Sequence, residues 1–289
     1  MKIVKILGGL GNQMFQYALY LSLKEQFPHE QVKIDISCFK SYPLHNGFEI
    51  NRIFAQNAPV ASFKDILKVA YPYPNYRFWQ VGKYILPKRK TMCVERKDFT
   101  FDATALIRKG NCYYDGYWQH EEYFCFVKDA IWSAFSFPEI TDKRNTEIIQ
   151  RFQTTNSVSL HIRRGDYINH PFFRGICDLD YYKRAICYME EQVAPRLYCI
   201  FSNDIDWCEN NLHELLSGKE VVYVDWNNGM ESYVDMQLMS LCQHNIIANS
   251  SFSWWGAWLN RNPQKVVVSP TKWLNIESES PIPQSWIKV

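Results

Sequence analysis

The alternation of strand-like and helix-like segments in the second half of the chain constrains the fold most. Short apolar runs typical of buried strands occupy residues 157–162, 196–201, 220–224, 245–248 and 265–268. Helical patterns occupy residues 180–192, 205–212, 232–242 and a short segment ending at 259. Asp204 is placed to cap the second of these helices, and Ser251 or Ser253 the last. This alternation predicts a parallel sheet with right-handed crossovers and helices on both faces.

The first half opens in the same way but soon loses its regularity. Residues 2–7 read as a strand, 8–12 as a glycine turn, 13–27 as a helix and 32–36 as a second strand. Between residues 37 and 137 only one further strand, over 111–118, is plausible. We therefore expect an α/β protein of two domains, with residues 1–150 in the first domain and 151–289 in the second.

Composition excludes several classes of protein. The 32 basic and 30 acidic residues leave a net charge of +2 with no long block of one sign, which argues against a nucleic-acid partner. Nine cysteines without a C-x-x-C pattern indicate buried, reduced thiols in a cytosolic protein. We expect neither a signal peptide nor a transmembrane anchor. The 16% aromatic content suits either sugar stacking or a bulky core.

Two phosphate-suited segments follow neighbouring predicted strands. His161, Arg163, Arg164 and Asp166 come at the end of the 157–162 strand, and an arginine fork donates two parallel hydrogen bonds to phosphate. The alternative is a solvated turn. After the 245–248 strand, the segment 250–253 joins serine hydroxyls to the free amides of a helix start, although an ordinary serine cap is the alternative. Together the two segments suggest a nucleoside diphosphate.

Other residues fill supporting roles in this interpretation. Asp225 and Asp235 are candidates to contact a guanine edge. Gly8 to Gln13 resembles a dinucleotide-binding turn, but its third glycine would fall at Met14, so contacts of Asn12 and Gln13 with sugar hydroxyls are the better interpretation. A helix start without a ligand is the alternative.

A divalent metal is not expected. The two D-x-D segments begin at Asp178 and Asp204, and both precede predicted helices, where aspartate commonly caps the helix. Arg163 and the amides of residues 250–253 would already supply positive field at a leaving diphosphate.

Several segments in order along the chain resemble the motifs of bacterial α1,2-fucosyltransferases, glycosyltransferase family 11. They are residues 8–18, 115–119, 123–124, 161–167, 201–204 and 249–259. The resemblance implies a GT-B fold of two Rossmann-like domains facing across a cleft. It also implies metal-independent, inverting transfer of fucose from GDP-β-L-fucose, a co-substrate, to the 2-hydroxyl of a terminal galactose. The galactose would belong to a glycan such as an O-antigen or a lactose-type acceptor.

The resemblance assigns roles residue by residue. Arg163 would contact the β-phosphate, while His161 and Asp235 would hold guanine or ribose. The other donor-binding residues would be Arg164, Asn203, Ser250, Ser251, Phe252 and Ser253. Contacts with fucose or the acceptor would come from Gly11, Asn12, Gln13, Tyr117, Trp118 and Gln119.

The resemblance leaves the general base unassigned. The more distantly similar α1,6-fucosyltransferases have a glutamate ten residues after the histidine that matches His161, and that position is Pro171 here. The catalytic candidates are Arg163, Asp166 and Asn12. Asp166 could take the proton of the acceptor hydroxyl or could orient Arg163 or Arg164.

Two alternatives to a fucosyltransferase stay open at this point. One is a transferase that uses another GDP-hexose, and the other is a carbohydrate-binding protein without catalysis. The expected acceptor is a galactose-terminated oligosaccharide or a lipid-linked glycan. The expected place is the cytoplasm, where a lipid-linked acceptor could bring the protein into peripheral contact with the inner membrane.

Overall fold

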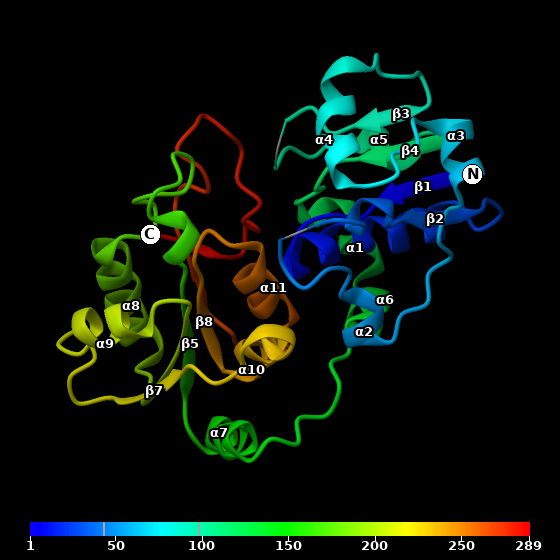
Figure 1. Ribbon diagram of the computed structural model, residues 1–289. Coiled ribbons are helices and arrows are strands. Elements are labelled where there is room, and N and C mark those ends of the chain that lie inside the picture. Colours follow the sequence, from blue (N-terminus) through cyan, green and yellow to red (C-terminus); the bar gives the residue numbers. More distant parts are fainter. Residues whose placement is uncertain (43, 98) are drawn as a thin grey trace. The chain divides into compact units, whose positions relative to one another are not determined.

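The computed structural model describes residues 1–42, 44–97 and 99–289. The chain folds into two units, Met1–Pro138 and Glu139–Val289 (Figure 1). The expected boundary after residue 150 falls inside helix α7 (Lys143–Thr154), and α7 packs against helices and strands of the second unit. The observed division therefore lies before α7 rather than near its end.

The first unit is built on a four-stranded parallel sheet with the order β2-β1-β4-β3. Its strands are β1 (Lys2–Lys5), β2 (Val32–Asp35), β3 (Met92–Val94) and β4 (Cys112–Asp115). Its helices are α1 (Leu10–Gln26), α2 (Ile50–Phe54), α3 (Phe63–Val69), α4 (Tyr76–Ile85), α5 (Ala103–Ile107) and α6 (Lys128–Ala134), with short 3-10 turns η1 (Ser37–Phe39), η2 (Glu121–Tyr123) and η3 (Cys125–Val127).

The strands of the first unit are held from both faces. Ile3 of β1 and Tyr113 of β4 form a core cluster with Ile66 and Val69 of α3, while α1 packs against β1 and β2. Lys5 forms a buried ion pair with Asp115, which joins the carboxyl ends of β1 and β4. The predicted βαβ opening is confirmed, and the aromatic segment between residues 37 and 111 contains β3 and four helices that periodicity did not reveal.

The second unit has a six-stranded parallel sheet with the order β10-β9-β8-β5-β6-β7. Its strands are β5 (Ser157–Ile162), β6 (Leu197–Ser202), β7 (Glu220–Val224), β8 (His244–Ile246), β9 (Val267–Ser269) and β10 (Ile287–Lys288). Besides α7, its helices are α8 (Leu179–Val193), α9 (Ile205–Leu212), α10 (Tyr233–Leu241) and α11 (Ser251–Leu259), with 3-10 turns η4 (Gly165–Tyr167) and η5 (Gly229–Glu231).

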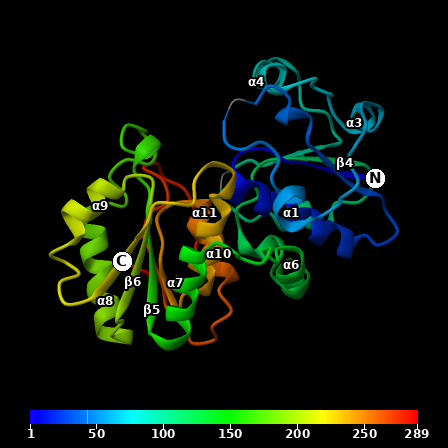
Figure 2. The same ribbon diagram turned by 60° about the horizontal axis from the view of Figure 1, so that its bottom comes forward.

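Helices cover both faces of the second sheet, as the strand–helix alternation predicts (Figure 2). α8 and α9 supply the core on one face, and α7 and α10 supply it on the other. Every residue of β5 is buried because that strand lies between β6 and β8. Both units are thus Rossmann-like, with parallel strands whose carboxyl ends meet at one edge of each sheet.

Helix caps follow the sequence closely. Asp204 caps α9 by accepting a hydrogen bond from the Trp207 amide, and Asp178 caps α8 through the Tyr181 amide. The cap of α11 is Ser250, one residue earlier than expected, because its hydroxyl accepts from the Phe252 amide.

The state of the cysteines and the presence of a membrane-spanning helix can both be read from the structure. All nine cysteines are free thiols in the described chain, but Cys125 and Cys187 are exposed, so the expectation that the cysteines are buried is wrong for these two. No described helix is both long and apolar enough to cross a membrane.

Candidate active site

Two adjacent arginines diverge just after β5. The Arg163 guanidinium donates to Asp166 Oδ1 at 2.8 Å and lies 5.5 Å from the centre of the Tyr167 ring. Arg164 turns the other way, where its Nε donates to Asp204 Oδ2 at 2.9 Å and its guanidinium stacks 4.1 Å from the Trp207 ring. Arg164 therefore joins the loop to the start of α9, whereas the Arg163 side chain contacts residues of η4 in the same loop.

Gly165 contacts the Asn203 side chain where the loop after β5 meets the end of β6. A Cβ atom at Gly165 would lie 2.2 Å from the side-chain nitrogen of Asn203. The side-chain oxygen of Asn203 accepts a hydrogen bond from the Arg164 amide at 3.0 Å. Asn203, predicted to contact the donor, thus also fixes the path of the loop that carries Arg163.

His161 is buried near the end of β5 and is uncharged. Burial, reinforced by the positive charge of Arg163, lowers the pKa of His161 to about 3. Its ring lies 5.9 Å from the ring of Phe252, the second residue of α11. Its Nδ1 has no hydrogen-bond partner within the described part of the chain. A buried polar atom without a partner is costly, so a ligand that approaches this edge of the sheet would satisfy it.

The start of α11 lies beside the loop after β5. The Tyr167 hydroxyl donates to the Asn249 carbonyl at 3.4 Å, which links η4 to the turn before the helix. Ser250 and Ser253 are buried, and Ser253 Oγ lies 3.4 Å from the Ala248 carbonyl oxygen, within hydrogen-bonding distance. Asn249 is also buried and donates to the Trp273 carbonyl, so its side chain fixes the turn before α11.

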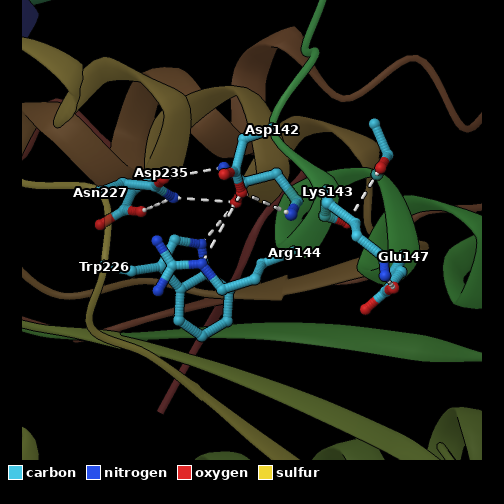
Figure 3. A network of polar contacts seen from close by, with 9 residues as sticks. Asp142, Lys143, Arg144, Glu147, Trp226, Asn227 and Asp235 are labelled. Carbon is cyan, nitrogen blue, oxygen red and sulfur yellow. Dashed lines mark hydrogen bonds and ion pairs between the residues drawn. The ribbon is translucent and has the colours of Figure 1, made fainter.

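Asp235, in the first turn of α10, belongs to a polar network with Asn227 and Asn145. Burial raises the pKa of Asp235 to about 7, against the lowering effect of a hydrogen bond from Asn227 Nδ2 at 2.8 Å. Asn227 in turn exchanges hydrogen bonds with Asn145 of α7, whose Oδ1 also accepts from Trp226 Nε1 at 2.9 Å (Figure 3). Asp225, the other guanine candidate, is exposed and its side chain is not part of this network.

Sequence reasoning missed Asn145 and Asn227. Neither belongs to a recognisable motif, and they are brought together only when α7 packs beside the loop after β7. The Arg144 guanidinium, 5.1 Å from the Trp226 ring, covers the network from the side of α7 (Figure 3).

The polar residues of the first unit divide into buried supports and accessible groups. Gln13 is fully buried, and its side-chain amide donates to the carbonyls of Gly8 and Gly47 and accepts from the Glu49 amide. Gly11 is buried beside it, in the first turn of α1, which begins at Leu10 rather than residue 13. The Gln13 side chain therefore shapes the turn, since its amide group is used on three backbone groups.

Asn12 remains partly accessible and is oriented by another predicted residue. Its Oδ1 accepts from Gln119 Nε2 at 2.7 Å. The turn at Gly8 has φ +94°, and a Cβ there would lie 2.9 Å from the Asn12 side-chain nitrogen, so glycine leaves room for this amide. Asn12 and Gln119 thus form one polar unit beyond the carboxyl end of β1.

Tyr117 and Trp118, expected side by side at a sugar, behave differently. Tyr117 is 40% exposed, whereas Trp118 is buried and packs edge-on against Tyr123 and Tyr114. The Glu95 carboxylate accepts from both backbone amides, at 2.6 Å for Tyr117 and 3.1 Å for Trp118. Trp118 consequently supports the turn, and Glu95, which the sequence analysis missed, sets its shape.

Groups of metal-ligating side chains were sought among the described residues. No group of three or more His, Cys, Asp or Glu side chains among them could hold a metal ion. Both expected caps of the D-x-D segments, Asp178 and Asp204, use their carboxylates on helix amides.

The match to known proteins extends over almost the whole chain. The model of glycosyl transferase family 11 matches residues 1–288. The chain belongs to glycosyl transferase family 11. It is thus a glycosyltransferase, and the residues collected at the carboxyl edges of its two sheets belong to a family 11 scaffold.

Individual relatives of this family 11 chain differ in the sugar they are named for. An α-1,2-colitosyltransferase of Escherichia coli is 34% identical over 99% of this chain and 98% of its own length. The O-antigen biosynthesis glycosyltransferase WbnK of Escherichia coli is 32% identical over 98% of each chain. A galactoside α-(1,2)-fucosyltransferase 2 of Oryctolagus cuniculus is 30% identical over 35% of this chain and 29% of its own length.

Proposed function

We propose that the protein transfers L-fucose from GDP-β-L-fucose to the 2-hydroxyl of a terminal galactose, with inversion and without a metal ion. The observation that carries the proposal is the cluster of His161, Arg163 and the start of α11 at one sheet edge, in a family 11 chain. A guanidinium and the amides of a helix N-terminus are groups that stabilise a departing diphosphate.

The donor would bind at the second unit. Arg163 and the amides at the start of α11 would bind the diphosphate, and His161 Nδ1, now without a partner, would take a hydrogen bond from or give one to the nucleotide. Asp235 would accept from the guanine N1–H and 2-amino groups, which both donate. The Asn145–Asn227 pair holds the Asp235 carboxylate in place for that contact.

The reaction would be a single displacement. The acceptor 2-oxygen forms a bond to the anomeric carbon while the bond from that carbon to the β-phosphate oxygen breaks. GDP leaves with the electron pair of that bond, and the proton of the acceptor 2-hydroxyl passes to the departing diphosphate, directly or through water. Arg163 stabilises the charge that develops on the leaving diphosphate. On the first unit, Asn12, fixed by Gln119, would bind sugar hydroxyls, and the exposed ring of Tyr117 would contact a sugar face.

We assign Asp166 the orientation of Arg163 rather than removal of the acceptor proton. Its Oδ1 is used in the ion pair with Arg163, and its side chain is 60% exposed to solvent. The role of general base is the alternative, and the dependence of turnover on pH separates the two.

A second candidate donor is a GDP-linked colitose, which is fucose without the 3-hydroxyl. The 34% identity over nearly the full length with an α-1,2-colitosyltransferase favours it. Both donors require the same diphosphate and guanine contacts, so they differ only where the hexose binds.

The deciding experiment incubates the purified protein with GDP-fucose or GDP-colitose, with and without lactose, in the presence of excess EDTA. GDP release and the mass and linkage of the product are followed. Fucosyl-α1,2-lactose formed in EDTA supports the proposal in full. Faster turnover of GDP-colitose would replace the donor, and loss of activity in EDTA that Mg²⁺ or Mn²⁺ restores would overturn metal independence. Absence of both GDP binding and GDP release would overturn the proposal itself.

A further inference from the structure

Exposed apolar side chains concentrate on two neighbouring helices of the first unit. Among the described residues, eight of the seventeen large hydrophobic side chains that are exposed lie between residues 60 and 86. On α4, Phe78, Val81 and Ile85 follow one another at helical spacing and are 61%, 59% and 70% exposed. On α3, Phe63 and Leu67 are one turn apart and are 61% and 53% exposed. We call the outer faces of α3 and α4, together with residues 86–90, the α3–α4 surface.

The apolar stripe on α4 is not an unsatisfied core face. The opposite side of the helix holds it to the unit through Tyr76, which packs edge-on against Tyr42, and Trp79, whose ring lies 3.8 Å from Lys5 Nζ. Gly82 permits the close approach of Tyr73, because a Cβ there would lie 2.2 Å from the Tyr73 ring. The helix is therefore anchored with its stripe turned outward.

The two helices form one surface because the chain after α4 returns to α3. The Arg89 guanidinium donates to the carbonyls of Leu67 and Ala70 at 2.7 and 2.8 Å, across the end of α3. Figure 2 places α3 and α4 on the same side of the first sheet, opposite α1.

The charge on the α3–α4 surface has one sign. From residue 66 to residue 94 the sequence has no Asp or Glu, and its six cations are Lys68, Arg77, Lys83, Lys88, Arg89 and Lys90. Lys64 adds a further exposed cation on α3. The one acidic residue of α3, Asp65, is used at the cap of the helix and in an ion pair with Lys33. The α3–α4 surface is therefore strongly basic, although the net charge of the whole chain is only +2.

We propose that the α3–α4 surface binds the surface of an anionic phospholipid bilayer, with the apolar stripe of α4 at the boundary between headgroups and acyl chains. A helix that exposes an apolar stripe bordered by cations is the arrangement that binds in the plane of such an interface. The cations attract phosphate headgroups. A second copy docked face to face would instead oppose cations to cations. The inference does not depend on which sugar the protein transfers.

The test measures sedimentation of the full chain with vesicles of phosphatidylcholine alone or with 30% phosphatidylglycerol. Wild type is expected to bind the anionic vesicles and to be released by 0.5 M NaCl, because exposed charges are screened at that ionic strength. The apolar variant is Phe78→Ser with Val81→Ser and Ile85→Ser, and the charge variant is Lys88→Glu with Lys90→Glu. The charge variant is expected to bind at least about tenfold more weakly, since one basic residue near such a surface contributes about fivefold. The apolar variant is expected to bind at least about tenfold more weakly too, because it loses the apolar area that α4 would bury in the interface.

Matched controls replace equally exposed side chains elsewhere. Ile107→Ser with Phe126→Ser, and Lys109→Glu with Lys272→Glu, are expected to bind as wild type does. All variants should keep their thermal midpoint and their turnover of a soluble acceptor, so failure of the proposed enzymatic activity is distinguishable from failure of membrane binding.

Three outcomes would overturn the inference. They are no binding of wild type to anionic vesicles, equal loss of binding in the control variants, and a dimer of wild type in light scattering that the apolar variant converts to a monomer without any vesicle binding. The last result would assign the surface to a second copy of the chain.

Discussion

The backbone of Gly165 lies against the side-chain amide of Asn203, with no room for a β-carbon between them. The contact joins the loop after β5 to the end of β6, the neighbouring strand. Because the same asparagine accepts a hydrogen bond from the Arg164 amide, the position of Arg163 depends on this contact.

Substitution of Gly165 by alanine is expected to displace the loop and lower kcat, because the new methyl group would overlap Asn203. Adding Asn203→Gly should restore part of the activity by making room, although the hydrogen bond to Arg164 is lost. Steady-state kinetics of the two single variants and the double variant measure the coupling. Strictly additive effects would contradict the steric explanation. Gly175→Ala, at a glycine with open space around it but positive φ, is a control for general loop strain.

Replacement of Arg163 by alanine is expected to lower kcat about 10²- to 10³-fold, because the departing diphosphate loses its charged donor. Lysine should rescue only part of the loss, since it lacks the planar fork. Arg174→Ala, which removes an exposed arginine of the same loop, is the control. A normal kcat for Arg163→Ala would exclude this role.

Asp166→Asn separates orientation from proton removal. If Asp166 positions Arg163, the variant should weaken donor binding, lower kcat less than about tenfold and keep the pH profile of wild type. A loss of about 10²-fold or more, together with disappearance of the acidic limb of the kcat profile, would instead show a general base. Initial rates between pH 5 and pH 9 at saturating donor and acceptor give the answer.

The carboxyl group of Asp235 should make GDP affinity depend on pH. Its pKa is raised to about 7, so the ionised form that accepts from guanine becomes dominant only above that pH, and GDP should bind more tightly as pH rises through 7. Asp235→Asn should bind GDP weakly at every pH, whereas Asp225→Asn, at an exposed position nearby, should behave as wild type. Calorimetric titration from pH 5.5 to 8.5 measures this, and a parallel pH dependence in Asp235→Asn would refute it.

The same group sets a trend in stability with the opposite sign. Because the pKa of Asp235 is higher in the folded chain than in the unfolded chain, its contribution to the free energy of unfolding is fully present below about pH 4 and is lost as pH rises through about 7. The slope is at most about 1.4 kcal/mol per pH unit. Urea unfolding of wild type and Asp235→Asn should therefore give a difference in free energy that varies with pH over this window.

Glu95→Gln tests the turn that presents Tyr117. A glutamine side chain has one accepting oxygen, so one of the two amides of Tyr117 and Trp118 would lose its partner, at a cost of about 1–3 kcal/mol. We expect a higher KM for the acceptor with an unchanged KM for the donor. Glu122→Gln, an exposed glutamate nearby, serves as the control. An equal rise in both KM values would indicate general loss of structure.

The second unit is largely predictable because its strands β5, β6, β8 and β9 are short buried apolar runs and helices alternate with them along the chain. The Asp204 cap and the adjacency of the β5 and β8 ends follow from local patterns of residues. β10 was missed because only two residues form it. In the first unit, α4 carries no buried residue, so its periodicity describes an outward apolar stripe rather than a core face.

Amide side chains show where sequence reasoning about the site stops. Gln13 and Asn12 are adjacent in one motif, yet the Gln13 side chain is hydrogen-bonded to backbone groups while Asn12 stays partly accessible. The motif alone does not predict this difference, because two of the partners of Gln13 belong to the distant segment around Glu49. Asn145 and Asn227 show the converse. Neither lies in a motif, yet Asn227 donates to the Asp235 carboxylate and Asn145 holds Asn227.

The contacts of Arg164 also order the loop after β5 in the folded chain. Its backbone is held by Asn203, and its guanidinium is clamped between Asp204 and Trp207, all before any nucleotide arrives. The entropy lost in ordering this loop is therefore lost when the chain folds, and not again at each encounter with the donor. The proposed donor would therefore bind to a loop that is already ordered.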